Sequence, residues 1–300
     1  MKEEKRFSNS QLKKNKDWMP GIWSLVSATE HEALFVVDKE NKSLKRVNLS
    51  SGAVDVLYRS PGNYSLRGAA FVADAQNRMH SLLLAEMQLK AIDNTMLFSV
   101  VVAELRDTAW TPTQRIALNN APSAEEWCVS ICAVQTNRVL CGVCGSSTLD
   151  VLAVTSAREA RKEALIQLGF VHTYFTCGVC DKTTLLFVKE LNFAVVRILE
   201  LTDGAPHALQ LLRRIEGSGA LWCNNGLLFL CIWSTQFYTA EVCVWRVSHG
   251  GRCVERLNET PITHADNLFI NRWCCFADKI ALYDKRSGDI VLYSYELKTK

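Results

Sequence analysis

Residues 33–58 read ALFVVDKENKSLKRVNLSSGAVDVLY. Three runs rich in Val, Leu, Phe and Tyr are separated there by DKENK and NLSSGAV, two segments that are typical of hairpin turns. Short apolar runs between turn residues are typical of strands and not of helices. The stretch therefore predicts three strands that are joined by two tight turns.

The same order of runs recurs along the chain. Four dipeptides of Trp followed by Ser or Cys, at Trp23, Trp127, Trp222 and Trp273, lie at spacings of 104, 95 and 51 residues, which are close to multiples of about 50. A Phe falls near each of the two vacant midpoints. The six markers, in chain order, are Trp23, Phe71, Trp127, Phe175, Trp222 and Trp273. They predict six units of about fifty residues each.

Each unit repeats the pattern of residues 33–58. The first run after each marker lies at 33–38, 79–86, 138–144, 184–190, 227–233 and 279–284. The second lies at 43–49, 96–104, 149–155, 193–201, 241–247 and 289–297, and in five units a further run follows at 54–58, 113–118, 162–168, 208–215 and 253–257. Residues 156–168 also fit a helix with Ser156 as its N-cap, but the unit pattern favours a strand in their second half.

Four strands per unit predict an all-β fold, a six-bladed β-propeller of four-stranded antiparallel blades. One such blade cannot bury both of its faces alone, whereas blades stacked radially can. Runs such as LLFLCIW at 227–233 are apolar at nearly every residue, which fits sheets covered on both faces. A β-sandwich with an insertion is the structural alternative. The predicted blades lie near 21–60, 66–118, 125–168, 170–216, 218–257 and 267–300.

Three stretches carry a resemblance to known propellers. EVCVWRVSHGGRCVERL at 241–257 resembles part of a WD-repeat blade, and residues 33–58 and 280–297 resemble WD-repeat and NHL-type blades. The chain departs from the WD pattern because it has no Trp-Asp dipeptide and no Gly-His pair. The resemblance implies a propeller fold and binding of protein partners, although a fold does not by itself fix a function.

The last unit lacks an outermost strand, because only residues 298–300 follow its run at 289–297. We expect a basic N-terminal arm at 1–17, followed by a single propeller domain at 18–300. Residues 6–12 of the arm are the candidate closing strand. The alternative is an open edge that a partner strand would occupy.

The net charge of +3 is located entirely in residues 1–17, so the rest of the chain carries equal numbers of positive and negative side chains. A nucleic-acid-binding body would show a basic excess, so at most a weak contact through the arm is expected. No apolar run approaches the roughly 18 residues that span a membrane. The polar start lacks the apolar segment of a signal peptide, which predicts a cytoplasmic or nuclear location without membrane contact.

The twelve cysteines lie mainly within apolar runs, where reduced Cys behaves as a small buried hydrophobe. The motif CGVC occurs twice and supplies the candidate zinc ligands, Cys141, Cys144, Cys177 and Cys180. Both motifs continue predicted strands, whereas zinc knuckles present their sulfurs from turns. We therefore predict structural thiols, no bound metal and no cofactor.

No common enzyme motif occurs, neither G-x-S-x-G nor H-E-x-x-H, Walker A or G-x-G-x-x-G. Asp38, Glu190 and Asp284 end predicted strands and could line one face, and His172 lies within a strand. His264 and Asp266 lie in a predicted loop. Nothing in their spacing distinguishes catalytic groups from ordinary polar residues at strand ends.

The sequence favours a non-catalytic scaffold or adaptor subunit of a larger complex, which binds one or more proteins through propeller faces or the last blade's edge. Trp18 and Trp110 fall outside the strand patterns and are the candidate partner contacts, because exposed Trp often contributes strongly to binding. Either of them could instead pack on its own blade. The alternative function is a propeller enzyme or metal-dependent binder that uses channel carboxylates or the CGVC pairs.

Overall fold

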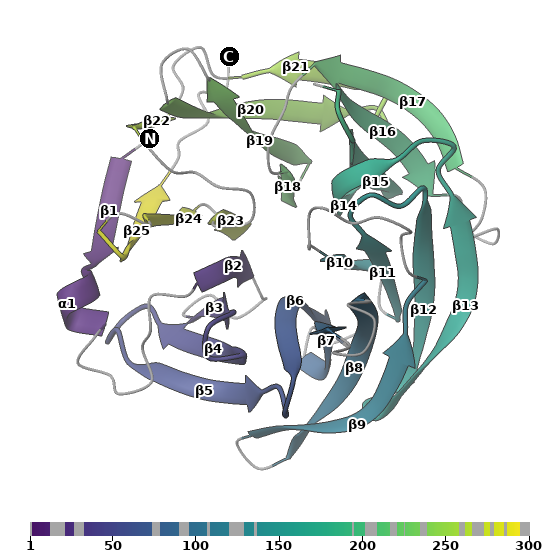
Figure 1. Ribbon diagram of the computed structural model, residues 1–300. Coiled ribbons are helices and arrows are strands. Elements are labelled where there is room, and N and C mark those ends of the chain that lie inside the picture. The colour runs from purple at the N-terminus through teal and green to yellow at the C-terminus, as the bar shows by residue number, and fades with distance from the viewer. Residues whose placement is uncertain are drawn as a thin grey trace.

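The computed structural model describes most of the chain. The described residues are 2–12, 22–26, 33–73, 79–89, 96–106, 109–119, 129–134, 137–193, 195–201, 209–216, 221–224, 226–234, 239–257, 262–265, 273–276, 279–284 and 287–294. Its strands form antiparallel sheets that stand around a common centre, as Figure 1 shows. This all-β arrangement is that of a β-propeller.

The first three sheets each contain four strands that pair in chain order. Sheet 1 contains β2 (Ile22–Val26), β3 (Ala33–Asp38), β4 (Ser43–Asn48) and β5 (Val54–Arg59). Sheet 2 contains β6 (Tyr64–Ala73), β7 (Met79–Leu89), β8 (Met96–Arg106) and β9 (Ala109–Ala117). Sheet 3 contains β10 (Val129–Val134), β11 (Arg138–Val143), β12 (Thr148–Ser156) and β13 (Glu159–Gln167).

Two of the remaining sheets depart from this simple order. Sheet 4 keeps it, with β14 (His172–Cys180), β15 (Thr183–Glu190), β16 (Val195–Leu201) and β17 (Leu209–Glu216). Sheet 5 contains β18 (Leu221–Asn224), β19 (Leu227–Ser234), β20 (Thr239–Ser248) and β21 (Cys253–Arg256), and β22 (Ile262–Ala265) also pairs with β20. Sheet 6 contains β23 (Trp273–Phe276), β24 (Lys279–Asp284), β25 (Asp289–Ser294) and β1 (Lys2–Phe7).

The innermost strands of the sheets contact one another in a closed circle. The order of contacts is β2, β6, β10, β14, β18, β23 and again β2. Five of these strands contain one of the aromatic markers, whereas Trp127 lies outside the described residues. The markers do not share a register, because Phe175 lies opposite Val188, five residues before the end of β14, while Trp222 lies opposite Phe229, two residues before the end of β18.

Buried apolar residues fill the spaces between neighbouring sheets. Strand β15 shows why the sequence runs are continuously apolar: Leu186 and Val188 pack towards sheet 3, and Leu185 and Phe187 pack towards sheet 5. Successive side chains of a strand point to opposite faces. A strand covered on both faces therefore needs apolar residues at every position.

The strand that completes sheet 6 comes from the N-terminus. Strand β1 pairs antiparallel with β25, with Lys2 opposite Ser294 and Phe7 opposite Ile290. The prediction that residues 6–12 form this strand is wrong in its bounds, because residues 9–12 form the short helix α1 (Asn9–Leu12). No helix of the described residues is long and apolar enough to cross a membrane.

A capping box ends β1 and begins α1. The Gln11 N–H donates to the Ser8 hydroxyl at 3.2 Å, and the Ser8 N–H donates to the Gln11 side-chain oxygen at 3.0 Å. This reciprocal pair satisfies backbone donors at a helix start. The change of direction carries Leu12 into the core, where it is fully buried.

Two further elements differ from the sequence analysis. The helical alternative at 156–168 is wrong, because residues 159–167 form β13 and pair with β12. Strand β22 was not predicted, and it places His264 opposite Ala240 in a strand instead of in a loop. Asp266 lies outside the described residues.

Candidate functional site

The most exposed apolar residues of sheet 4 at one of its ends are Val171 and Phe193, which are 38% and 60% exposed. The sequence analysis placed Phe193 in a strand, but it lies in the turn between β15 and β16. The Leu191 N–H donates to the Val171 carbonyl at 2.8 Å, which joins this turn to the segment before β14. We call Phe170, Val171, Leu191 and Phe193 the sheet 4 tip.

An Arg side chain contacts the sheet 4 tip. The Arg197 guanidinium lies 4.1 Å from the centre of the Phe170 ring. The same guanidinium pairs with the Glu190 carboxylate at 2.8 Å. Asn192 adopts a left-handed conformation with φ of 64°, which Asn tolerates better than most residues. Phe170, Val171 and Leu191 are therefore tied to sheet 4 by these contacts, and Phe193 projects next to them.

The three carboxylates predicted to line a face are each used within their own hairpin. Asp38 is buried and forms an ion pair with Lys45 at 2.5 Å, and Glu190 forms its ion pair with Arg197. Asp284 accepts a hydrogen bond from the Ser287 hydroxyl at 3.0 Å. Asp38–Lys45 and Glu190–Arg197 share a spacing of seven residues, a signal that was present in the sequence. These groups stabilise turns.

Sequence reasoning missed the fully buried carboxylate of Glu86 on β7. Glu86 is fully buried, and it accepts hydrogen bonds from the hydroxyls of Tyr58 and Ser60 at 2.8 and 2.6 Å and from Arg115 at 2.6 Å. Burial, together with the charge of Glu86, raises the pKa of Tyr58. The network joins the outermost strand of sheet 1 to sheet 2. Both oxygens of the Glu86 carboxylate therefore accept hydrogen bonds.

His172 is a buried histidine at the start of β14. Its Nδ1 lies 2.6 Å from the Ser146 carbonyl, which can only accept, so Nδ1 carries the proton. Its Nε2 has no hydrogen-bond partner among the described residues. A Cβ at Gly142 would lie 2.7 Å from that nitrogen, so a side chain there would displace the ring. Burial lowers the pKa of His172 to about 4, and the ring is neutral at pH 7.

The four candidate zinc ligands are buried but do not form one site. Cys141 packs between sheets 2 and 3, Cys177 between sheets 3 and 4, and Cys180 between sheets 4 and 5, while Cys144 is buried in the turn after β11. Residues three apart on a strand point to opposite faces, so a CGVC motif on a strand separates its sulfurs. Over the described parts of the chain, no three His, Cys, Asp or Glu side chains gather as a metal site would require.

Trp110, a predicted partner contact, is only 6% exposed on β9. Its ring meets Phe71 edge-on at 6.1 Å, within the apolar cluster between sheets 1 and 2. The prediction that Trp110 contacts a partner at the surface is therefore wrong, because the neighbouring sheet covers this outer strand. Trp18 lies outside the described residues.

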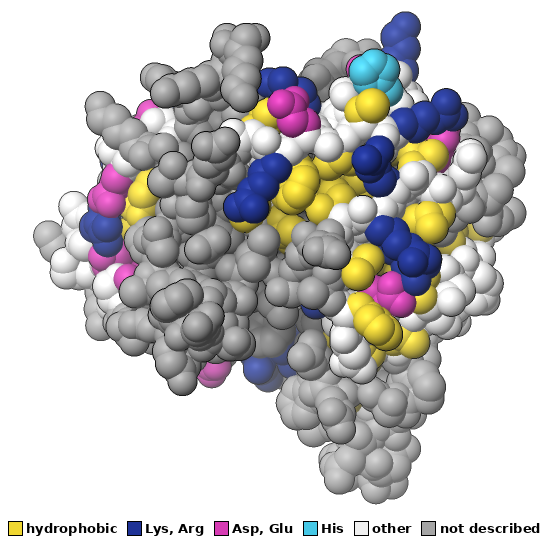
Figure 2. All heavy atoms as spheres, turned by 90° about the horizontal axis from the view of Figure 1, so that it is seen from above, with side chains coloured by type: hydrophobic (Ala, Val, Ile, Leu, Met, Phe, Trp, Pro, Cys, Tyr) yellow, Lys and Arg dark blue, Asp and Glu magenta, His cyan; other side chains and the backbone are white. Residues whose placement is uncertain are grey.

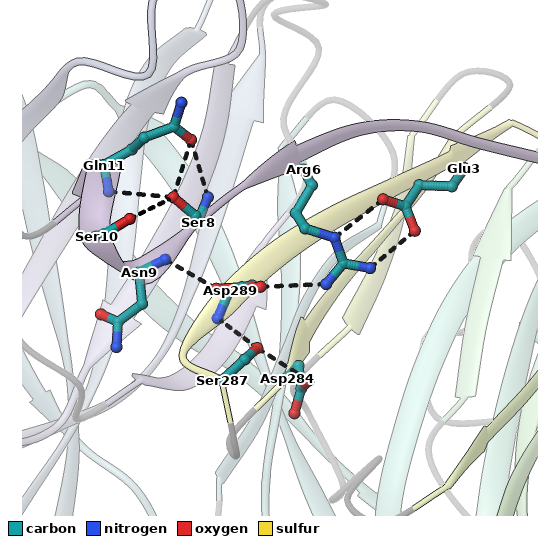
Figure 3. A network of polar contacts seen from close by, with 9 residues as sticks. All are labelled: Glu3, Arg6, Ser8, Asn9, Ser10, Gln11, Asp284, Ser287 and Asp289. Atoms are coloured by element: carbon teal, nitrogen blue, oxygen red, sulfur yellow. Dashed lines mark hydrogen bonds and ion pairs between the residues drawn. The ribbon is translucent and has the colours of Figure 1, made fainter.

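We call the contact of β1 and α1 with β25 and sheet 1 the seam. It carries the polar network drawn in Figure 3. Arg6 pairs with Glu3 at 2.8 Å and with Asp289 at 3.1 Å. Asp289 also accepts the Asn9 N–H at 2.8 Å. Burial raises the pKa of Asp289, but hydrogen bonds from Asn9, Arg6 and Ser287 outweigh it and hold this pKa below its usual value. A cleft of 480 Å³ lies between β1, α1 and residues 50–53.

Exposed apolar residues are unevenly distributed over the described surface. The large ones are Leu105, Leu165, Val171, Val179, Phe193 and Leu211. All except Leu105 lie between residues 165 and 211, on β13, on sheet 4 or in the segments next to its strands. Figure 2, seen from above Figure 1, shows hydrophobic side chains that reach the surface among Lys and Arg side chains. Sheet 4 and the segments next to its strands therefore carry more of these exposed large hydrophobic residues than any other described sheet.

No protein-family model and no curated protein matches this sequence. Solved structures do match its fold over more than nine tenths of the chain. A protein from Lactobacillus plantarum has 15% identity and a TM-score of 0.62, with 92% of this chain and 81% of that chain covered. Streptogramin B lyase has 10% identity and a TM-score of 0.52, with 97% of each chain covered.

A third similar structure is a β-propeller domain by name. The β-propeller domain of Cps50 (Swd1) from Myceliophteria thermophila has 11% identity and a TM-score of 0.50, with 92% of this chain and 97% of that chain covered. At such low identity these likenesses define the fold alone. The chain is a divergent β-propeller protein, as the resemblance of its blade sequences predicted.

Proposed function

We propose that this chain is a non-catalytic scaffold or adaptor subunit, built as a closed six-bladed propeller, that binds protein partners. The observation that carries the proposal is the sheet 4 tip, where Phe193 and Val171 are exposed on a turn fixed by Arg197 and Glu190. Aromatic residues beside Arg are enriched among the residues that contribute most to protein binding. A rigid surface also loses little conformational entropy when a partner docks.

The surroundings of the buried ionisable side chains support the same function. The buried carboxylates Asp38 and Glu86 each accept from donors of the same or a neighbouring sheet, and His172 is enclosed and neutral. A general acid or base needs access to a substrate and a pKa near the working pH. These groups instead fix turns and the contacts between sheets.

The alternative is a propeller enzyme or a metal-dependent binder, since two similar structures are lyases by name and one of them is in complex with manganese. We rank it second because the predicted channel carboxylates are used as turn contacts within their hairpins. We place the scaffold in the cytoplasm or nucleus, where cysteines such as those of this chain stay reduced. Protein partners are expected, and membrane contact is not.

Affinity capture with quantitative mass spectrometry tests the proposal. Phe193→Ser should remove most of the proteins captured by the wild-type chain while the melting temperature stays the same. Leu105→Ser is the matched control, because Leu105 is 47% exposed but lies on β8, in sheet 2. Partners that persist with Phe193→Ser would reject the tip as the binding surface. An absence of reproducible partners for the wild-type chain would reject the scaffold function.

A further inference from the structure

A pair of cysteines lies between the innermost strands of sheets 3 and 4. Cys132 is on β10, and Cys177 is on the neighbouring strand β14. The Cys177 N–H donates to the Cys132 sulfur at 3.2 Å. Both residues are free thiols. Two thiols that are 45 residues apart in sequence therefore meet across the boundary between two sheets.

Cys132 differs in its surroundings from the other thiols between the sheets. A hydrogen bond with the Cys177 thiol lowers the pKa of Cys132, and the Cys177 N–H and the Thr176 hydroxyl lower it further, against the effect of burial. Burial raises the pKa of Cys141 instead, and the negative charge of Asp150 adds to this effect. The thiolate is the nucleophilic form of Cys, and hydrogen-bond donors stabilise it.

Access also separates Cys132 from the buried cysteines. Cys132 is partly exposed, as are its strand neighbours Ile131 and Ala133, whereas Cys141 and Cys274 are fully buried. A small oxidant therefore has less protein to cross to reach Cys132 than to reach Cys141 or Cys274. Cys177 is nearly buried and lies directly against Cys132, which is the position of a second thiol that would react with an oxidised first one.

We propose that Cys132 and Cys177 are a redox-active thiol pair that hydrogen peroxide converts into a disulfide between sheets 3 and 4. In the first step the Cys132 thiolate attacks one peroxide oxygen. An S–O bond forms, the O–O bond breaks, and the departing hydroxide takes up a proton to become water. In the second step Cys177 attacks the sulfenic sulfur, so that the S–S bond forms, the S–O bond breaks and a second water leaves. Two thiols and one peroxide thus give one disulfide and two waters.

The disulfide would change the stability of the protein measurably. A crosslink between residues 132 and 177 restricts the unfolded chain, and in the loop-entropy description this raises the melting temperature. The two residues already touch, because the Cys132 sulfur lies 3.2 Å from the Cys177 backbone nitrogen. This inference is independent of the proposed scaffold function.

Peptide mapping without reduction tests the proposal on the wild-type full-length chain. Treatment with hydrogen peroxide, followed by alkylation of free thiols, should yield one crosslinked peptide pair that contains Cys132 and Cys177 and has lost two hydrogen atoms. The melting temperature of the oxidised protein should rise by several degrees and return after treatment with dithiothreitol. The exposed Cys253 should not be part of the crosslink, so Cys253→Ser is the matched control and should behave like wild type.

Two variants separate the roles of the cysteines. Cys177→Ser should stop the reaction at a sulfenic acid on Cys132, which dimedone traps, and Cys132→Ser should give neither product. The wild-type map decides the question even if a variant folds poorly. The proposal is overturned if Cys132 remains alkylatable after Cys253 has been oxidised, or if Cys132 crosslinks to any cysteine other than Cys177.

Discussion

Two junctions between sheets hold the propeller together in different ways. The seam between sheets 6 and 1 includes a strand from the far end of the sequence, and its surface carries charged contacts. Lys5 donates to the carbonyls of Leu49 and Ser50 at 2.6 and 2.9 Å, and Lys279 pairs with Glu4. The junction of sheets 3 and 4 has buried apolar residues, a neutral histidine and thiols.

The difference shows which contacts give the seam its position and which give it stability. The exposed ion pairs of Arg6 and the Asp289–Asn9 hydrogen bond set where β1 and α1 lie. Phe7 and Leu12 are the apolar anchors, because both are buried in a cluster formed by sheets 6 and 1. We infer that polar contacts fix the register of the seam and that the two anchors supply most of its free energy.

The largest expected effect is the removal of the seam. Deletion of residues 1–12 should lower the free energy of unfolding by about 5 kcal/mol, because it exposes the cluster that Phe7 and Leu12 cover. It should also leave β25 as an unpaired edge that promotes self-association. Urea unfolding and size-exclusion chromatography measure both effects. Phe7→Ala alone should cost about 3 kcal/mol, and a deletion variant that stays monomeric with unchanged stability would contradict the comparison.

A buried ion pair inside a hairpin should matter more than the exposed pairs of the seam. Lys45→Met leaves the Asp38 carboxylate, which is 1% exposed, without its cation. We expect a loss of about 4 kcal/mol in the free energy of unfolding, the cost of an uncompensated buried charge. Arg46→Met is the control on the next residue, because its pair with Asp55 is exposed. Equal effects of the two variants would show that burial does not decide the strength of these pairs.

The junction of sheets 3 and 4 should weaken in acid through His172. Its pKa is about 4 in the folded chain and about 6.5 in an unfolded one. Between these values the unfolded chain binds a proton that the folded chain does not, so stability falls as pH falls from 6.5 to 4. The loss from this group reaches about 3 kcal/mol at pH 4.

His172→Asn removes the titrating ring and keeps a donor near the Ser146 carbonyl. The variant should therefore lack this part of the pH dependence, measured by urea unfolding at several pH values. His249→Asn is the control, because His249 is exposed in the turn after β20 and Asn tolerates its positive φ of 52°. If the free energy of unfolding of His172→Asn falls with pH as steeply as that of the wild type, the acid sensitivity comes from carboxylates and not from His172.

The strands of the sheets were predictable because their sequences carry a strong local signal. Residues 33–38 and 279–284 form β3 and β24 with the predicted bounds, since apolar runs between turn residues leave few alternatives. Strand β1 was misplaced because KEEKRF has no apolar run. Its end was nevertheless encoded, because Ser8 and Gln11 match the capping-box spacing.

The contacts between sheets were not predictable in the same way. Cys132 and Cys177 meet because β10 and β14 lie next to each other around the centre, which depends on how two separately folded sheets pack. Trp110 is buried because sheet 1 covers an outer strand of sheet 2. Phe193 is exposed because β16 begins two residues later than its apolar pattern suggested. Local patterns define the strands, but packing between sheets decides which side chains stay accessible.

The smallest expected effect is the loss of an ion pair at the seam. Arg6→Gln should lower the free energy of unfolding by less than about 1 kcal/mol, because the Arg6 side chain is 40% exposed and such pairs gain little in water. The effect should shrink further at high salt, which screens exposed charges. The neighbouring Phe7→Ala variant supplies the contrast on the same strand, and its effect should not depend on salt. Urea unfolding of both variants at low and high salt makes the measurement. If Arg6→Gln costs as much as Phe7→Ala, the charged network of Figure 3 contributes to the stability of the seam as well as to its register.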